Sequence, residues 1–545
     1  MEFDLAHLHD AIARAIPDRE CMVWRDRRYT WRQVADRSRS LAGLLHHRGL
    51  GLRGDPAQAA DWESVHDHIG LYLYNSPEYL EAMIGAHAAR LAPFNVNYRY
   101  VGDELAYLFR DARPRAIVYH ARFAPTLAEV RGQLAEEVLL LQVADESGQG
   151  LLAGAIDYEE ALAAHPPEAP PVDPGPDDLH ILYTGGTTGM PKGVLWRSAD
   201  LLAGPLGVRR RDGSPFSSLD EVVERAAASD RRVLPAPPLM HGSGTWFALG
   251  GWFSGATVVI QDVVDHLDAR DVVSVLERER VTSTMVIGNA FARPLADEIE
   301  RQGVTLSSLR SMLNSGAELS SDVKGRLVAL IPGLRINDTL GSSETGPQAT
   351  RRGSDASRFA PGPDVAVLSD DLTGRLQPGD EQIGWVAQAG AVPRGYLGDR
   401  EKTARTFRLV EGTRFAVPGD RAVLHDDGTI ELLGRDAMTI NSGGEKIFAE
   451  EVEAVLRRAP GVLDALVIGR PSERWGQEVV ALVQLASGAE PADEQLLDAC
   501  AGHLARYKLP KAFVRVPRVQ RQPNGKADYA WAKTVVLPPD GGASP

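Results

Sequence analysis

The sequence predicts an α/β protein with a large N-terminal multi-sheet domain and a small, mobile C-terminal α+β domain. Three observations predict this fold class. Short apolar runs typical of buried strands alternate with segments of helical spacing along most of the chain. The 545 residues exceed the length at which a single hydrophobic core stops growing. Near residue 434 the pattern changes, and a hairpin leads into a glycine-rich turn and a capped helix.

The N-terminal part follows a strand and helix alternation. Residues 29–50 are expected to form a helix, since Thr30 and Gln33 make a capping-box pair ahead of apolar residues at helical spacing. Residues 68–74 and 115–120 have the composition of strands, and Ser76 with Pro77 marks the start of a helix between them. Such alternation predicts a mainly parallel sheet.

The same unit returns later in the chain. Residues 256–262, 269–281 and 282–288 are expected to form strand, helix and strand. The acidic, proline-rich residues 165–178 are expected to form a linker, and residues 52–66 and 209–232 to lie on the surface. The change near residue 434 predicts a division into domains 1–434 and 435–545.

Composition excludes several function classes. The apolar content of 43 %, the charged content of 24 % and the net charge of -15 describe an acidic globular protein, which argues against nucleic-acid binding and against binding to an anionic membrane. Cys21 and Cys500 have no metal-ligand spacing and suit a reducing compartment. The N-terminus lacks the pattern of a signal peptide, and no long apolar stretch occurs, so we expect a cytoplasmic protein without a membrane span.

A glycine- and threonine-rich loop follows the apolar run at residues 179–183. The sequence "YTGGTTGMPKG" leaves backbone N–H groups exposed, which is the composition of a phosphate-binding loop. A Walker A loop needs a glycine before its lysine and a hydroxyl residue after it, whereas Pro191 and Gly193 flank Lys192 here. A different nucleotide chemistry is therefore indicated, and a plain surface turn is the alternative.

Six ordered motifs extend this signal across nearly the whole chain. They are "YTGGTTGMPKGV", "PLMHGSG", "NSGAELS", "TLGSSETG", "VPGDRAVLHDDGTIELLGRDAMTINSGGEKI" and "QPNGKADYAWAK". In this order they resemble the adenylate-forming superfamily of acyl-CoA synthetases, adenylation domains and luciferases. "GLYLYNSPEYLEAM", "NVNYRY" and "FARPL" are similar to segments of actinobacterial fatty-acyl and steroid-side-chain CoA ligases.

The resemblance implies that ATP activates a carboxylic acid as an acyl adenylate, which the thiol of CoA then attacks. Bringing a carboxylate against the α-phosphate at ~4 Å costs about 4 kcal/mol at an effective dielectric of 20, so cations are needed there. By resemblance, Lys526 is the catalytic lysine and Glu344 ligates Mg²⁺. The implied nucleotide-binding residues are Thr184, Gly185, Gly186, Thr187, Thr188, Gly189, Lys192, Asp338, Thr339, Leu340, Gly341, Ser342, Ser343, Asp420 and Arg435.

The acyl pocket is also assigned by resemblance. His241 corresponds to the gate between the acyl pocket and the pantetheine tunnel, although a half-buried structural histidine is the alternative. Small wall residues beside aromatic ones predict a bulky, mostly apolar carboxylic acid. The expected wall comprises Gly242, Ser243, Gly244, Trp246, Asn289, Phe291, Ser315, Gly316 and Ala317.

Residues of "SGGEKI" are expected to serve the second step. After rotation of the small domain, Gly443 and Gly444 would let pantetheine pass close to the backbone, and Lys446 would meet a phosphate of CoA. The resemblance is also compatible with a homodimer.

Two positions depart from the family pattern. The family usually places an aromatic residue, which stacks on adenine, where this chain has Leu340, and the hinge position holds Ala437. Lost stacking costs on the order of 1 kcal/mol. Three alternatives to an acyl-CoA ligase therefore stay open: an acyl-AMP ligase that loads a carrier protein, a variant impaired in adenylation that thioesterifies a supplied acyl adenylate, and a non-enzymatic acyl- or nucleotide-binding protein.

Overall fold

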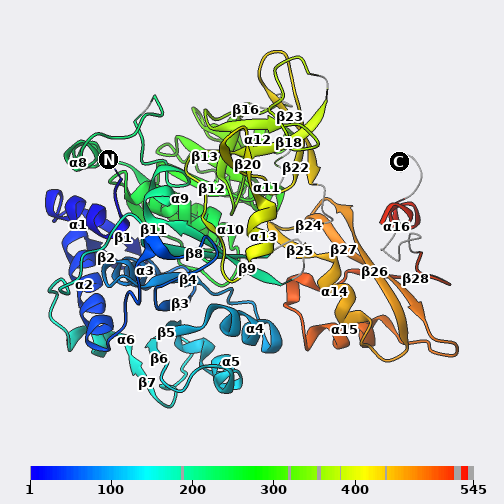
Figure 1. Ribbon diagram of the computed structural model, residues 1–545, viewed down its shortest axis with the longest axis horizontal. Coiled ribbons are helices and arrows are strands. Elements are labelled where there is room, and N and C mark those ends of the chain that lie inside the picture. The colour runs from blue at the N-terminus through cyan, green and yellow to red at the C-terminus, as the bar shows by residue number, and fades with distance from the viewer. Residues whose placement is uncertain are drawn as a thin grey trace.

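The computed structural model describes residues 2–185, 190–210, 212–316, 319, 321–352, 358–380, 382–435, 439–520 and 529–537 (Figure 1). A large multi-sheet body holds the N-terminal part of the chain, and a smaller sheet domain follows it. The predicted fold class is confirmed. In the described part of the chain, no helix has the length and apolar character needed to cross a membrane.

The first large sheet has eight strands in the order β19-β9-β8-β4-β3-β5-β6-β7. Neighbours from β8 to β7 run parallel, as the alternation predicts, whereas β9 pairs antiparallel with both β8 and β19. The strands are β3 (His68–Tyr72), β4 (Ala92–Asn95), β5 (Pro114–His120), β6 (Leu139–Val143), β7 (Ala155–Asp157), β8 (Leu179–Gly185), β9 (Pro191–Arg197) and β19 (Gly395–Tyr396).

The second large sheet has nine strands in the order β16-β15-β14-β13-β12-β10-β11-β1-β2. Its central strands are parallel, and both edges turn antiparallel. The strands are β1 (Glu20–Trp24), β2 (Arg27–Thr30), β10 (Arg232–Pro235), β11 (Thr257–Ile260), β12 (Ser283–Val286), β13 (Ser311–Ser315), β14 (Arg335–Ser342), β15 (Gly346–Arg352) and β16 (Ala360–Pro361).

Helices fill the space between the two sheets and cover their outer faces. The largest apolar cluster contains Leu71 of the first sheet, Val258 of the second and Trp31 of a helix, so the core is continuous through the body. The capping box of Thr30 and Gln33 is confirmed. The helices are α1 (Leu5–Ala15), α2 (Trp31–His47), α3 (Pro77–Ala88), α4 (Gly102–Ala112), α5 (Ala124–Glu129), α6 (Tyr158–Ala163), α7 (Ser198–Ala203), α8 (Leu219–Ala227), α9 (Gly242–Trp252), α10 (Ala269–Arg278), α11 (Gly288–Gln302), α12 (Ser321–Leu330) and α13 (Arg400–Thr406).

A smaller sheet completes the body, and a fourth sheet forms the C-terminal domain. The third sheet holds β17 (Val365–Leu368), β18 (Ile383–Gln388), β20 (Phe407–Val410), β21 (Thr413–Ala416), β22 (Asp420–Leu424) and β23 (Ile430–Arg435). The C-terminal domain holds β24 (Thr439–Ser442), β25 (Glu445–Phe448), β26 (Val462–Ser472), β27 (Gly476–Leu485) and β28 (Ala512–Arg515), with helices α14 (Ala449–Leu456), α15 (Asp493–Ala501) and α16 (Tyr529–Val536).

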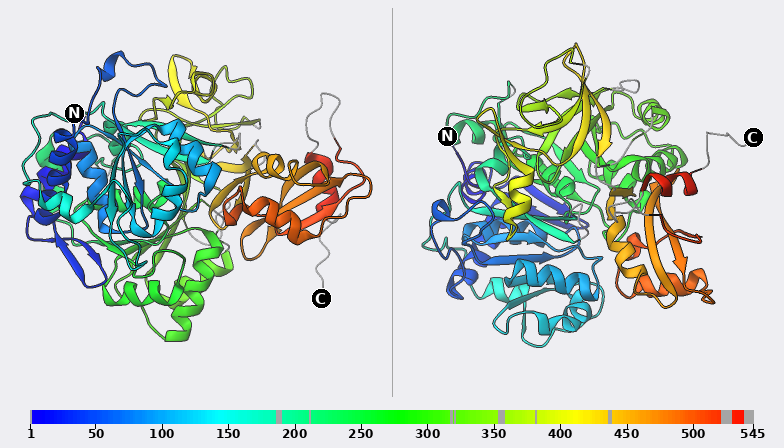
Figure 2. Two further views of the ribbon diagram at one scale, coloured as in Figure 1. Left: turned by 90° about the horizontal axis from the view of Figure 1, so that it is seen from below. Right: turned by 45° about the vertical axis from the view of Figure 1, so that its right-hand side comes forward.

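The C-terminal domain lies beside the body (Figure 2), and β24 and β25 lie on the side of the domain that faces the body (Figure 1). Its own apolar cluster includes Val452, Val467 and Ala481 and is separate from the cores of the body. A separate core is what a domain that moves as a unit requires. The boundary at residue 434 and the mobility of this domain stay predictions.

We expect Gly255 to be essential for stability. Its φ is +75°, and a Cβ built there would lie 1.9 Å from the carbonyl oxygen of Ala226 at the end of α8. Gly255→Ala should therefore lower the free energy of unfolding by about 4 kcal/mol or more. The matched control is Gly303→Ala, where φ is +66° and no heavy atom lies within 4 Å of the added carbon. That change should cost only about 1–2 kcal/mol. Urea denaturation measures both, and equal losses would contradict the steric argument.

Candidate functional site

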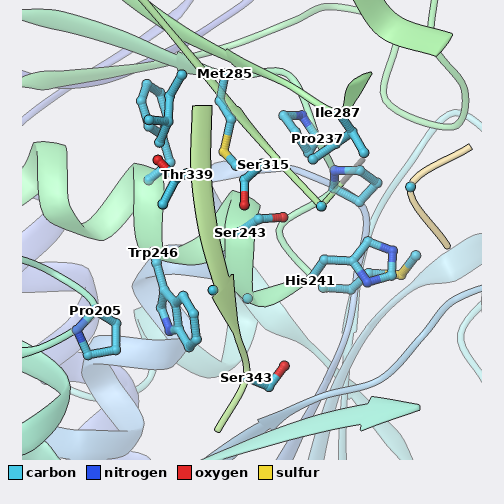
Figure 3. A pocket seen from close by; sticks show the side chains of 18 of the residues that line it. Pro205, Pro237, His241, Ser243, Trp246, Met285, Ile287, Ser315, Thr339 and Ser343 are labelled. Atoms are coloured by element: carbon cyan, nitrogen blue, oxygen red, sulfur yellow. The ribbon is translucent and has the colours of Figure 1, made fainter. Parts of the chain in front are cut away.

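A cavity of about 460 Å³ lies where the body meets the C-terminal domain. Figure 3 shows His241 and Trp246 on opposite sides of this space, with Ser243 and Ser315 between them. The walls come from the strand ends of both large sheets, from α9, and from the turn between β24 and β25. Because the carboxyl ends of parallel strands converge there, ligand-binding side chains from distant segments meet at one place.

One face of α9 forms the long wall of the cavity. Its lining residues recur at helical spacing, namely Gly242, Ser243, Trp246, Phe247, Gly250 and Gly251. At 1.5 Å per residue, the ten steps of α9 span roughly 15 Å. The cavity is therefore elongated, with His241 at one end and Ser254, Arg225 and Arg231 at the other.

The strands β8 and β9, which flank the predicted phosphate loop in sequence, lie beside this cavity. Thr184 lines the cavity, and Lys192 pairs with it across the two strands. Lys192 Nζ lies 3.7 Å from Asp399. Although burial acts in the opposite direction, the charges of Tyr107 and Asp111 raise the pKa of Lys192, so the ammonium stays charged. Gly186, Thr187, Thr188 and Gly189 lie outside the described residues.

Two buried asparagines fix the segment that carries His241. The Asn95 amide donates to the carbonyl oxygens of Tyr183 at 2.9 Å and of Met240 at 2.6 Å. Asn75 accepts from the backbone N–H of Leu239 at 2.6 Å. Because Tyr183 ends the apolar part of β8, Asn95 holds this end of β8 and the His241 segment together. Sequence analysis singled out neither asparagine, although Asn75 directly follows the predicted strand at residues 68–74 and Asn95 begins the quoted segment "NVNYRY".

His241 contacts the C-terminal domain directly. Its Nε2 atom lies 3.0 Å from Oε1 of Glu445, which also forms an ion pair with Arg99. Burial, and secondarily the charge of Arg99, lower the pKa of His241 to about 3. The imidazole is therefore neutral at physiological pH. Arg99 and Glu445 were not singled out from sequence, although both belong to quoted segments.

The Gly443–Gly444 turn closes the cavity beside His241. Both glycines have positive φ, 58° and 85°, which disfavours other residues. A Cβ on Gly444 would lie 2.3 Å from Cγ2 of Ile287, and one on Gly443 would lie 2.9 Å from the Trp475 ring. The bare backbone at these positions lets the C-terminal domain reach the body. This arrangement agrees with the expected second state, in which "SGGEKI" occupies the site.

A second cavity, of about 680 Å³, adjoins the first. Arg99, Pro238, Phe291 and Gly443 line both cavities, so the two spaces are neighbours. The second cavity carries charges of both signs and an aromatic surface: its described lining includes Arg293, Arg474 and Trp475, together with the acids Asp265, Asp297 and Glu473. The Arg474 guanidinium lies 4.6 Å from the centre of the Trp475 ring.

The turn between β14 and β15 supplies the predicted nucleotide residues. Thr339, Gly341, Ser342 and Ser343 line the cavity. The Glu344 carboxylate is buried and accepts a hydrogen bond of 2.8 Å from the Tyr396 hydroxyl. Sequence analysis did not single out Tyr396, whose fixed position restrains this acidic side chain. The backbone carbonyl of Ser343 accepts a bond of 3.0 Å from the Trp196 indole.

Two neighbouring residues of the predicted nucleotide site lie off the cavity wall, and their roles stay predictions. Asp338 does not line the cavity, because its buried carboxylate pairs with Lys324 and accepts bonds from Arg351 and Asn314, each at 2.9 Å. It therefore stabilises β14. Leu340 packs partly against the apolar cluster of the third sheet and is likewise absent from the cavity wall. Alternation along β14 turns both side chains away from the face that carries Thr339.

The acyl wall is partly as predicted. Gly242, Ser243, Trp246, Phe291, Ser315 and Gly316 line the first cavity. Asn289 lines the second cavity instead. Gly244 is not among the described residues that line this cavity, and a Cβ there would lie 2.4 Å from the carbonyl oxygen of Pro238, so this glycine allows close backbone packing. Its place in the acyl wall stays a prediction. Ala317 lies outside the described residues.

The remaining predicted residues lie at or beyond the domain junction. Asp420 is buried at the start of β22 and pairs in register with Arg435, the last residue of β23. Lys446 lies in β25 opposite Asn441. Lys526 and Ala437 lie outside the described residues, and their roles stay predictions.

Comparison with known proteins identifies the family. The model of the AMP-binding enzyme matches residues 9–397, and that of the AMP-binding enzyme C-terminal domain matches residues 451–526. The chain belongs to the AMP-binding enzyme family. The resemblance read from the six motifs is thereby confirmed.

Full-length relatives of this AMP-binding enzyme are CoA ligases. The chain is 51 % identical over 537 residues to the medium-chain acyl-CoA ligase Mig of Mycobacterium avium, with 97 % of this chain and 98 % of the relative covered. It is 36 % identical over 542 residues to the medium/long-chain-fatty-acid--CoA/3-oxocholest-4-en-26-oate--CoA ligase of Mycobacterium tuberculosis, with 97 % and 95 % covered.

Solved structures share the AMP-binding enzyme fold. The o-succinylbenzoate CoA synthetase of Bacillus subtilis, bound to a product analogue, matches with a TM-score of 0.77 and 21 % identity, and 98 % of this chain and 99 % of that chain are covered. The amide bond synthetase of Marinactinospora thermotolerans matches with a TM-score of 0.77 and 21 % identity, covering 97 % and 99 %.

We expect His241 to stay neutral from about pH 5 upward, because its pKa is lowered to about 3. Between pH 3 and the ordinary value of 6.5 the unfolded chain binds more protons at this residue than the folded chain does, so His241 destabilises the fold as the pH falls through that window. NMR titration of the imidazole signals, assigned with His241→Gln, measures this. A midpoint near pH 6.5 would show that the imidazole is solvated.

Proposed function

We propose that this enzyme is an ATP-dependent acyl-CoA ligase, which activates a bulky hydrophobic carboxylic acid as an acyl adenylate and transfers the acyl group to CoA. The observation that carries the proposal is the meeting of Glu445 and the Gly443–Gly444 turn with His241 at the cavity. A segment of the C-terminal domain, which is proposed to move between the two half-reactions, thus lies where a thiol would meet an activated acyl group. The relatives, named as CoA ligases, support the same activity.

The first half-reaction needs positive charge around a carboxylate and three phosphates. Lys192 supplies one cation beside the phosphate loop, and Lys526 is proposed to bridge the carboxylate and the α-phosphate from the C-terminal domain. Thr184, Ser342 and Ser343 offer neutral donors along the cavity wall. The donors from β8 and from the β14–β15 turn would orient the nucleotide, while Asp420 and Arg435 are proposed to contact its ribose.

Magnesium fits the donor set of the β14–β15 turn. A magnesium ion that accompanies nucleotide phosphates keeps several waters and takes only one or two carboxylates from the protein. Glu344 provides one buried carboxylate, restrained by Tyr396. Among the described residues, no group of three or more metal-ligating side chains forms a cage, so a magnesium ion here would depend on the bound nucleotide. When bound, it would neutralise phosphate charge.

His241 is proposed to act as the gate between the two cavities in the second half-reaction. As a neutral side chain it adds no charge that would repel or trap a thiolate, and its contact with Glu445 ties its position to that of the C-terminal domain. A thiol arriving through the second cavity would pass Gly443, which lines both spaces. Glycine permits this close approach of the chain to the backbone.

The second cavity favours CoA as the thiol acceptor. Arg293 and Arg474 are cations, and Trp475 offers a flat apolar surface, a combination suited to the phosphates and adenine of CoA. A carrier protein delivers a pantetheine arm with one phosphate and needs no second adenine site. The carrier-loading enzyme therefore remains the alternative, as does an enzyme impaired in adenylation.

The acyl end of the first cavity supports a large substrate. Its volume of about 460 Å³ lies within the range of pockets for drug-sized ligands, and Trp246, Phe247 and Phe291 supply apolar surface. At roughly 25 cal/mol per Å² of apolar surface buried, a long-chain or polycyclic acid should bind better than acetate by several kcal/mol. The relatives' names include medium-chain acyl groups and a steroid acid.

The deciding experiment separates the two half-reactions. Wild-type protein should catalyse acid-dependent exchange of pyrophosphate into ATP and form acyl-CoA, detected by mass, with best activity on large apolar acids. Lys526→Ala should lose exchange by about a hundredfold or more but retain thioesterification of a supplied acyl adenylate within about tenfold. Lys533→Ala, at an exposed position of α16, is the matched control and should change neither.

Other outcomes identify the alternatives. Exchange without acyl-CoA, together with loading of a carrier protein, would establish the acyl-AMP ligase. Thioesterification without exchange in the wild type would establish the variant impaired in adenylation. Ligand binding without either half-reaction would leave a non-enzymatic binding protein.

A further inference from the structure

The first cavity, called the acyl cavity from here on because the acyl group is proposed to bind there, carries positive charge at its far end. Arg225, near the end of α8, and Arg231, just before β10, line the cavity beside Ser254, and both side chains are exposed. Among the described residues that line this cavity, Glu445 is the one carboxylate, and it contacts His241 at the other end. In a protein of net charge -15, two unbalanced cations at the end of an apolar space are an unusual arrangement.

Close packing at the end of α9 fixes the backbone that carries these two arginines, whereas their side chains are exposed. Gly255, just after α9, packs against the backbone of Ala226 at the end of α8. Gly251 packs against β10, because a Cβ added there would lie 2.6 Å from the Val233 side chain. The Arg225 guanidinium donates to the carbonyl oxygen of Arg209 and lies 5.6 Å from the centre of the Phe216 ring. Neither contact cancels its charge. Among the described residues, no carboxylate forms an ion pair with the guanidinium of Arg231, and burial and Arg225 lower its pKa.

We propose that Arg225 and Arg231 recognise an oxygen acceptor, an oxo or carboxylate group, at the end of the substrate opposite the reacting carboxylate. An acid held along α9 with its carboxylate near His241 brings its far end to these guanidinium groups. A charged donor gains most from an oxygen acceptor and little from a methyl group. The proposal deepens the proposed function, because it names a feature of the acid that the same cavity binds.

Acids of equal chain length that differ only in the group at the far end test whether the two arginines recognise a distal oxygen. Hexadecanoic acid, 16-oxohexadecanoic acid and hexadecanedioic acid are compared by kcat/KM with wild type, Arg225→Gln, Arg231→Gln and the double variant. The double variant should lose about tenfold or more on the oxo acid and the diacid, and less than about twofold on the unsubstituted acid. Arg48→Gln, at an exposed position after α2, is the control and should leave all three values unchanged.

This experiment distinguishes a failure of the arginine proposal from a failure of the proposed ligase function. Turnover of hexadecanoic acid by wild type shows that the ligase works, whatever the arginines do. Equal losses on all three acids, or unchanged selectivity in the double variant, would overturn the recognition of a distal oxygen.

A second inference comes from a buried ion cluster at the domain junction. Lys508 Nζ, in the C-terminal domain, lies 2.8 Å from Oε1 of Glu451 in α14 and 2.6 Å from Oε1 of Glu104 in α4 of the body (Figure 1). All three side chains are at most 7 % exposed. Lys508 also lines the acyl cavity.

The cluster holds two carboxylates against one ammonium. The second carboxylate oxygens of Glu104 and Glu451, both Oε2, are buried without a hydrogen-bond partner. Other groups facing the cluster are the phenols of Tyr100 and Tyr507, and Arg99, whose guanidinium lies 5.7 Å from the centre of the Tyr507 ring. An unpaired buried negative charge is costly, and a proton on one carboxyl group removes it.

We infer that docking of the C-terminal domain in this arrangement takes up one proton at the Glu104–Glu451 pair, so that Glu104 and Lys508 are positioning residues for the thiol step. Separation of the domains would return Glu104 to water and release the proton. This inference rests on the proposed two-step function. The pKa of Glu451, raised by burial to about 7, agrees with it.

The sign of the pH dependence follows. A carboxyl group whose pKa is raised by docking favours the docked state at low pH, and the effect is lost as the pH rises through about 7. Between about pH 5 and pH 7, docking should weaken by up to tenfold per pH unit. The nearby His503 and Asp103 form an exposed pair 3.5 Å apart across the junction, so a variant of His503 is included as a control.

The test follows thioesterification of a supplied acyl adenylate from pH 5 to pH 8, with pyrophosphate exchange as internal reference. After correction for thiol ionisation, wild type should lose rate with rising pH, whereas Glu104→Gln should be flat. Glu494→Gln, an exposed acid of α15, should retain the wild-type profile. A pH profile that Glu104→Gln leaves unchanged, or one abolished by His503→Asn instead, would overturn the proton uptake. Absence of acyl-CoA in wild type would instead refute the proposed function.

Discussion

The Asn95 amide is the contact on which the arrangement of the site depends. Through one side chain it bonds to the backbone at Tyr183 and at Met240, two segments more than fifty residues apart in sequence. The phosphate loop and the His241 segment are therefore held at a fixed separation from within the core. A hydrogen-bonded amide can do this in a buried setting, because it satisfies the backbone groups of both irregular segments at once.

Charge placement is the second constraint on this enzyme. The acidic chain must handle a carboxylate, a triphosphate and the phosphates of CoA, so its cations are placed individually and held by packing. Lys192 stands beside the phosphate loop, Arg474 in the second cavity and Arg231 at the far end of the acyl cavity. Lys192 is partly buried, whereas Arg474 and Arg231 are exposed, so water and salt screen the charges of the two arginines more than that of the lysine.

Much of the fold could be read from the sequence, because it depends on local patterns. The capping box at Thr30, the strand and helix alternation and the hairpin before the glycine-rich turn all follow from neighbouring residues. The motifs also singled out Thr184, Ser343 and Gly443, which line the same cavity in the structure. Side-chain direction was harder to predict. Asp338 belongs to the predicted segment, but strand alternation directs its side chain toward Asn314 and away from the cavity. Gly244 also belongs to a predicted segment, but it lies against the carbonyl oxygen of Pro238. Arg99, Glu445 and Tyr396 act through partners far away in sequence, which no local pattern reveals.

The close approach of Gly444 to Ile287 has a pharmacological consequence. Part of the acyl cavity wall belongs to the C-terminal domain, so the cavity has a different shape whenever that domain stands elsewhere. A compound that places even one methyl group between Gly444 and Ile287 would clash sterically and would disfavour this arrangement of the domains. Inhibitors built on this space would thus select among conformations of the enzyme, and their potency would report on domain position as well as on chemical fit.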